Sequence, residues 1–327
     1  MATPGALLRR FPSATPQAPA DTFFESAFTL TVGERSAFVL DAMAGRVFRF
    51  DREGRLQGVV GRRGPGPGEL QSPVALREDA AGLLRVADPR AGRLARFRPD
   101  GSYDGQTVTP HPVTNFTVLE SGEIVVPTLS ANTLLGTLDD AGRVRRLVVD
   151  PAKVPESLRR GPRDRVPLGV LAMVPWATDT LLLFRNRHAT DFRAWLVALT
   201  PRRDSIRDVR PLPLPGWLYT LIEEEVALLR RQLPDELERG DFLVPFKSVR
   251  NVDGTVWLAP APSGRVIAVS LPRDAADTAT VVVPAGEEAE GMLDAAVIGD
   301  RLLALYSTEL RVYRLDPAPP ELFDPPE

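Results

Sequence analysis

The chain has 327 residues, of which 43% are apolar and 25% charged, a globular composition that excludes wholesale disorder. It contains no cysteine, which excludes disulfides and thiolate metal sites. The formal net charge of −3 argues against nucleic-acid binding, because such proteins usually carry a clear basic excess.

The N-terminal residues give two indications. Residues 1–10 have no apolar segment of the kind that a signal peptide requires. Residues 6–11 form a strand-like stretch that precedes any repeating unit. Further along, no run approaches the ~20 apolar residues that a membrane-spanning helix needs. We therefore expect no membrane span.

Two stretches of the chain repeat each other at a spacing of 47 residues. Residues 46–55 and 93–102 are alternating strands that end in a glycine-containing turn. An aspartate, Asp41 or Asp88, stands five residues before the first arginine of each stretch. We expect these aspartates to cap the turns that follow their strands through side-chain-to-backbone hydrogen bonds.

The segment between the two stretches is rich in glycine. Residues 61–70 read GRRGPGPGEL and are followed by Pro73. Together with RVAD at 85–88 and the strand at 93–101, this segment resembles the NHL-repeat family. That family joins its blades with G-x-x-G-x-G-P-G-E/Q-F/L-x-x-P and continues with a V-A-D strand end. The resemblance is specific over residues 36–107 and implies a β-propeller.

The same succession of short strands continues to the C-terminus. Turns between first and second strands are predicted at 33–34, 81–82, 121–122, 178–179, 253–254 and 299–300. Six units of four strands predict an all-β, six-bladed β-propeller. The last unit has three good strands before the proline-rich residues 316–320, so we expect residues 6–11 to close its ring as the outer strand. The prediction is a single domain over residues 1–327.

A helical insertion is predicted at residues 215–240, between blades four and five. Apolar residues recur at helical spacing from Leu218 to Leu233, with Arg230 and Arg231 near the end. This apolar stripe is expected to pack on the propeller's own face, and the groove of a partner protein is the alternative. A second, basic and proline-rich insertion at 151–166 is expected to be an irregular loop.

Candidate ligand-binding residues are expected on the face that carries the inter-blade linkers, where similar propellers usually bind their ligands. They are His111, Asn115, Arg185, Arg187, His188, Trp217 and Lys247. The two histidines, paired with Asn115 or Asp191, have the chemistry for metal ligation or acid–base catalysis. Arg62 and Arg63 would join Arg185 and Arg187 in an anion-binding patch. The alternative is that the histidines lie in ordinary surface loops and that the arginines are solvated charges.

Two functions remain open at this stage. The sequence has no P-loop, no HExxH and no G-x-S-x-G motif, which favours a non-catalytic binding or scaffold propeller without a cofactor that recognises a protein, peptide or glycan. The alternative is a metal-dependent hydrolase or lyase of gluconolactonase-like type. It would hold Ca²⁺ at the central axis, with Asn115 and Asp294 as candidate ligands. We expect a monomer, and the family resemblance implies an extracytoplasmic location.

Overall fold

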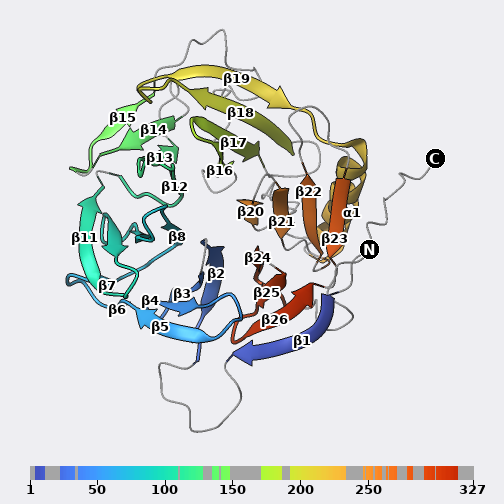
Figure 1. Ribbon diagram of the computed structural model, residues 1–327, viewed down its shortest axis with the longest axis horizontal. Helices are drawn as coiled ribbons and strands as arrows, with labels where there is room; N and C mark the ends of the chain where they lie inside the picture. Colours follow the sequence, from blue (N-terminus) through green and yellow to red (C-terminus); the bar gives the residue numbers. More distant parts are fainter. Residues whose placement is uncertain are drawn as a thin grey trace.

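Six four-stranded antiparallel sheets stand around a central axis in the computed structural model (Figure 1). This arrangement confirms the predicted six-bladed β-propeller. The structure describes residues 4–11, 23–33, 36–109, 111–127, 135–139, 141–147, 171–185, 192–232, 246, 248–252, 255–259, 263, 265–270, 278–282, 291–298 and 300–315.

In each blade the strands are ordered from the axis outward. Blade one is β2–β5 (Ala27–Val32, Ala37–Asp41, Arg46–Phe50, Leu56–Val60). Blade two is β8–β11 (Ala75–Glu78, Leu84–Asp88, Arg93–Phe97, Tyr103–Val108). Blade three is β12–β15 (Thr117–Val118, Ile124–Pro127, Leu135–Leu138, Val144–Arg146).

The second half of the ring follows the same order. Blade four is β16–β19 (Leu171–Ala177, Thr180–Arg185, Arg193–Leu199, Ile206–Leu212). Blade five is β20–β23 (Ser248–Val252, Thr255–Ala259, Val266–Ser270, Thr278–Val282). Blade six is β24–β26 (Asp294–Ile298, Arg301–Leu305, Leu310–Leu315) with β1 (Pro4–Phe11) as its outer strand.

The pairing of β1 with β26 confirms the predicted closure of the ring. The two strands are antiparallel, with Arg10 opposite Arg311 and Phe11 opposite Leu310. The ring of Phe11 lies 5.0 Å from that of Phe50 and 5.3 Å from that of Phe24, measured between centroids. The N-terminal strand therefore joins the last blade through its backbone and the first blade through an aromatic cluster.

Apolar side chains of neighbouring blades pack against one another and form the core. One buried cluster joins blades one and two and includes Phe38, Leu76 and Phe97. Another joins blades six and one and includes Phe48 and Leu303. Each sheet buries both faces in this way, which explains why most residues of the middle strands are buried.

Asp41 binds the linker that enters blade one, so the predicted role as a cap of the following turn is wrong. Its carboxylate accepts hydrogen bonds from the backbone N–H groups of Glu25 at 2.9 Å and Ser26 at 2.8 Å. Arg46 forms an ion pair with the same carboxylate at 3.3 Å and donates to the carbonyl of Phe23 at 3.0 Å. Asp41 and Arg46 thus supply hydrogen-bond partners to backbone N–H and C=O groups of the linker.

Asp88 repeats this arrangement in blade two, where the cap prediction is wrong for the same reason. It accepts from the N–H groups of Gln71 at 2.8 Å and Ser72 at 2.9 Å. Arg93 lies 3.9 Å from it and donates to the carbonyl of Glu69 at 2.7 Å. An aspartate and an arginine five residues apart therefore bind the incoming linker in both blades. We call each such pair a linker clasp.

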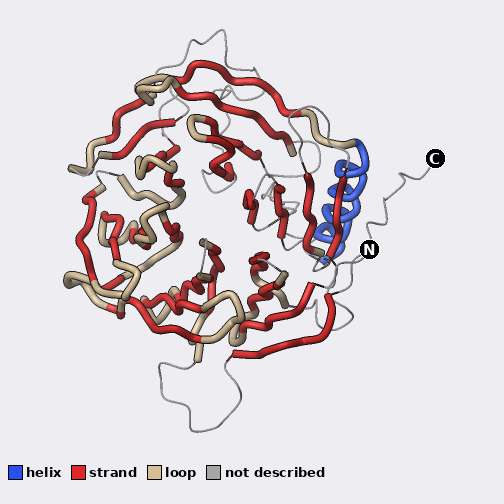
Figure 2. The backbone as a smooth tube through the Cα atoms, viewed as in Figure 1, coloured by secondary structure: helices blue, strands red, loops and turns tan. Residues whose placement is uncertain are grey.

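The helix α1 (Gly216–Gln232) lies beside blade five, within the predicted insertion (Figure 2). Its residues Leu218, Ile222 and Val226 are buried in the cluster formed by blades four and five. The stripe therefore packs on the propeller itself, as predicted. Residues 233–240 of the insertion, and the second insertion at 151–166, lie outside the described residues.

Candidate functional site

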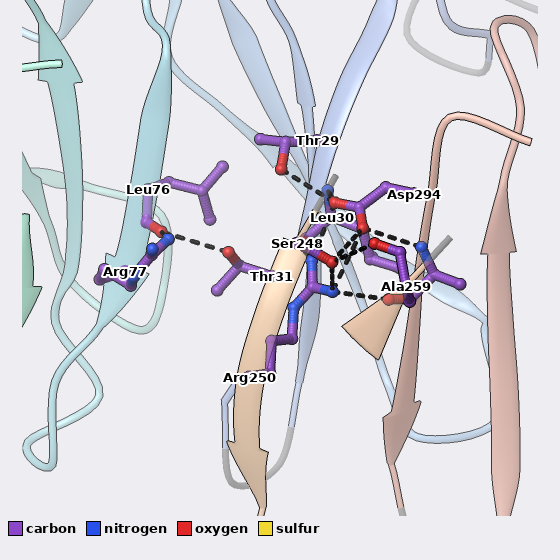
Figure 3. Close-up of polar contacts among 10 residues, drawn as sticks. Thr29, Leu30, Thr31, Leu76, Arg77, Ser248, Arg250, Ala259 and Asp294 are labelled. Atoms are coloured by element: carbon purple, nitrogen blue, oxygen red, sulfur yellow. Dashed lines mark hydrogen bonds and ion pairs between the residues drawn. The ribbon is translucent and has the colours of Figure 1, made fainter. Parts of the chain in front are cut away.

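The innermost strands of four blades contribute polar side chains that meet near the axis (Figure 3). These strands are β2, β8, β20 and β24. Each enters from the linker-bearing face, and its free edge has no neighbouring strand. Polar side chains are therefore needed there to satisfy buried backbone groups.

Asp294, the first residue of β24, is the centre of this network, with 3% of its surface exposed. One carboxylate oxygen accepts from the hydroxyl of Thr29 at 3.0 Å and the N–H of Leu30 at 2.9 Å. The other lies 2.9 Å from the hydroxyl of Ser248. Arg250 donates to both oxygens, at 2.8 and 3.2 Å. This carboxylate joins blade six to blades one and five.

Both terminal nitrogens of Arg250 donate to groups of the protein. Besides Asp294, its guanidinium donates to the carbonyl of Ala295 at 2.6 Å and to the carbonyl of Leu30. Because Arg and carboxylate meet in a fork, the pair is geometrically specific as well as charge-neutral. The Asp294–Arg250 pair is an inner closure of the ring, at the opposite edge of the blade from β1.

Arg77 lies across the axis from this pair, on β8 (Figure 3). It is partly buried and donates to the carbonyl of Leu76 at 2.7 Å, an oxygen that also accepts from the hydroxyl of Thr31 at 3.2 Å. Its guanidinium lies 6.0 Å from the ring centroid of Phe116. Burial, and next the positive charge of Arg250, lower the pKa of Arg77 to about 10. Arg77 therefore stays charged at neutral pH.

The donor set around Asp294 does not fit a calcium ion. Both of its oxygens are used by N–H and O–H donors, and two guanidiniums stand nearby where a cation would be repelled. Among the described residues, no group of three or more histidine, aspartate or glutamate side chains is placed to hold a metal. Asn115, the other candidate ligand, is partly exposed in the linker before β12.

The linker-bearing face of blade one carries a second cluster, the blade-one patch, formed by Phe23, Met43, Arg62 and Arg63. Met43 is 58% exposed and Phe23 39% exposed. Arg63 donates to the carbonyl of Met43 at 3.2 Å. The clasp arginine Arg46, which follows the turn that contains Met43, donates to the carbonyl of Phe23 and lies 6.0 Å from the centroid of its ring.

The patch rests on the glycine-rich linker that the sequence singled out. In it β6 (Arg62–Arg63) and β7 (Glu69–Leu70) form a parallel pair. Glu69 accepts from the N–H of Gly66 and from Arg62, each at 2.8 Å, and these bonds lower its pKa. Gly45 has a φ of 63°, and a side chain there would stand 2.5 Å from the carbonyl of Leu70. The linker is thus held in one conformation against blade one.

The other sequence candidates do not form one cluster in the described residues. His111 is exposed in the linker between blades two and three. Asn115, in the same linker, is partly exposed. Trp217 is partly buried at the start of α1, against the cluster of blades four and five. Arg185 is the last residue of β17. Arg187, His188 and Lys247, with Asp191, lie outside the described residues.

Sequence reasoning missed Arg77, Arg250, Phe23 and Met43. Arg77 and Arg250 each lie in an inner strand, and a charge in such a strand is the signal that could have marked them. Met43 follows the clasp aspartate Asp41 in a turn, and nothing in the local pattern distinguishes it from other turn residues.

Comparison with known proteins supports the fold. No family model matches the sequence, and no curated protein is significantly similar to it. A Bacteroides fragilis protein named for its expected export has a similar structure, with a TM-score of 0.54 at 11% identity, covering 92% of this chain and 93% of the other. These values show a shared propeller fold.

Two further solved structures are similar to this chain. Virginiamycin B lyase from Staphylococcus aureus superposes with a TM-score of 0.52 at 9% identity over 89% of this chain and 95% of the lyase. The protein U3-55K has a TM-score of 0.55 at 12% identity over 95% and 100% of the two chains. Similarity at such low identity shows the fold alone, and function has to be argued from the sites. No helix in the described parts of the chain has the length and apolar character to cross a membrane.

Proposed function

We propose that this propeller is a binding module that recognises an acidic protein or peptide segment through the blade-one patch. The observation that supports this is an exposed set of aromatic, methionine and arginine side chains on a rigid linker. These residue types are the ones enriched at the centres of protein interfaces. Burying Met43 and Phe23 would supply affinity, because both leave apolar surface in water.

The charge of the patch indicates the chemistry of its partner. Arg62 is 81% exposed at its side chain, although it pairs with Glu69. Arg63 is exposed and, in the described part of the chain, has no carboxylate partner. Arginine forms bidentate bonds with carboxylates, so acidic side chains next to an apolar anchor are complementary to this surface. The fixed linker reduces the entropy that binding would cost.

Selection from a displayed library of random 12-residue peptides tests this function. We expect enrichment of peptides that combine Asp or Glu with an apolar residue. The substitutions Met43→Asp and Arg63→Gln should each weaken binding of a selected peptide at least tenfold. Arg143→Gln is the matched control, since Arg143 is an exposed arginine of blade three paired with Asp139, and it should leave binding unchanged.

Three outcomes would contradict the proposal. Peptide binding that survives both patch substitutions would place recognition elsewhere on the molecule. A glycan that binds in an array while no peptide is enriched would replace the peptide class with a carbohydrate. Turnover of a small molecule by the purified protein would favour the hydrolase or lyase alternative.

We also infer that the propeller belongs with NHL-type propellers. The support is the glycine-rich linker and the pair of linker clasps, which recur at the same spacing in blades one and two. An extracytoplasmic location and a monomeric state stay predictions. Fractionation of the native host and light scattering of the purified protein would test them.

A further inference from the structure

Two arginines of the innermost strands, Arg77 and Arg250, stand on opposite sides of the axis, close enough for the charge of Arg250 to lower the pKa of Arg77. Asp294 and Glu78 are the acidic residues of the described innermost strands. Asp294 is already bound in a fork by Arg250. Glu78, the residue after Arg77, has its carboxylate against Gly33 of blade one. In the part of the chain that the structure describes, no carboxylate pairs with Arg77.

The surroundings of Arg77 hold its guanidinium in place. Its donor bond to Leu76 uses one of five N–H groups, and the fully buried ring of Phe116 lies 6.0 Å from its centre. Leu76 is itself fixed to blade one through Thr31. A partly buried cation with spare donors and no counter-ion costs free energy unless an anion joins it.

We propose that Arg77 is an oxyanion-binding residue near the axis of the propeller and that its ligand is a small molecule bearing a carboxylate. The planar fork of the guanidinium matches a carboxylate, which would neutralise the charge that Asp294 leaves uncompensated. Arg250 remains with Asp294 and raises the local positive potential. This site is separate from the blade-one patch and does not depend on the proposed peptide-binding function.

Thermal unfolding in the presence of simple anions tests the site. The probes are acetate, succinate and inorganic phosphate, each compared with chloride at equal ionic strength. Since a ligand that binds only the folded state raises its stability, we expect the midpoint to rise with acetate and succinate concentration. Arg77→Gln should abolish this rise, and Arg143→Gln, which removes an exposed arginine outside both proposed sites, should retain it.

Direct titration gives a second readout. By calorimetry the dissociation constant for succinate should increase at least tenfold in Arg77→Gln. Arg77→Lys keeps the positive charge and loses the bidentate geometry of the guanidinium, so its dissociation constant for succinate should be intermediate. This variant replaces Arg77→Gln in the test if the glutamine variant does not fold. A larger response to phosphate than to succinate would assign the site to phosphate-bearing ligands and overturn the carboxylate proposal.

Three results would reject the site altogether. These are no difference between the probes and chloride, an equal response in wild type and Arg77→Gln, or an equal loss in Arg143→Gln. Binding of the selected peptides, measured on the same variants, separates the two proposals. Arg77→Gln should leave peptide binding unchanged, and the patch variant Met43→Asp, which removes no arginine, should leave the succinate response unchanged.

Discussion

A single buried carboxylate attaches the linker to each of the first two blades. Asp41 and Asp88 are fully buried, and each accepts two backbone N–H groups from residues that precede its blade. A neutral acceptor would form weaker bonds, because charge-assisted hydrogen bonds are about twice as strong. The neighbouring arginine offsets the cost of burying the charge and binds a linker carbonyl as well.

Replacing Asp88 with asparagine should destabilise the protein strongly. The change removes the counter-charge of Arg93, whose Nε already has no hydrogen-bond partner, and leaves a buried cation behind. Breaking a buried pair in this way costs about 3 kcal/mol of unfolding free energy. Urea denaturation measures the loss. Asp100→Asn, a change at an exposed turn residue, is the control. It should lower the free energy of unfolding by less than about 1 kcal/mol, as surface substitutions usually do. Equal losses would contradict the clasp.

At this scale the sequence identified the aspartates but not their partners. Their spacing from Arg46 and Arg93 repeats visibly, and it marks both as structural residues. The partners lie 15 to 17 residues upstream, in linkers that come close only when the blade is assembled. In the sequence, the turn that follows each aspartate is the nearest segment with backbone N–H groups for it to bind. In the folded chain that turn forms its own backbone hydrogen bonds.

The helix α1 is held to the propeller by a polar anchor in addition to its apolar stripe. Glu225, only 1% exposed, accepts from the N–H of Ser263 at 3.0 Å and from its hydroxyl at 2.6 Å. Arg265 lies 3.4 Å from the same carboxylate. These contacts fix the helix to the loop between β21 and β22 of blade five.

Substitution of Glu225 by glutamine should loosen the helix. The change removes the charge that faces Arg265 and weakens two bonds to Ser263, which together correspond to about 1–3 kcal/mol. Hydrogen exchange should become faster over residues 216–232, while the strands of blades one and two keep their protection. Glu223→Gln, on the exposed side of the helix, should leave the exchange unchanged. A uniform increase across all blades would show that Glu225 supports the whole ring instead of the helix.

The spacing of apolar residues was sufficient to predict this helix, because a stripe at 3.6-residue periodicity needs an apolar surface to cover. Periodicity does not reveal which surface. The buried Glu225 sits in a run of three glutamates that reads as solvated charge, and only the position of Ser263 in the folded chain distinguishes it from its neighbours.

The ring is closed at two radii. At the rim β1 pairs with β26, and at the axis Asp294 binds Leu30 of blade one and Arg250 of blade five. The rim closure could be predicted, because a last blade with three strands requires a fourth from elsewhere in the chain. The axial closure joins residues 264 positions apart in the sequence, and no local pattern indicates such a contact.

Removing residues 1–11 should open the rim closure and leave the axial one in place. The edge of β26 would then expose unpaired N–H and C=O groups, which favour pairing with another chain. We expect the truncated protein to associate increasingly with concentration in size-exclusion chromatography, relative to the full chain. A synthetic peptide of residues 4–11 should reverse this association, because it restores the partner of β26.

Phe11→Ala, which keeps the strand and loses the ring contacts, should reduce stability by about 2 kcal/mol without promoting association. If the truncated chain keeps the stability and the elution volume of the full chain, the axial pair alone closes the propeller.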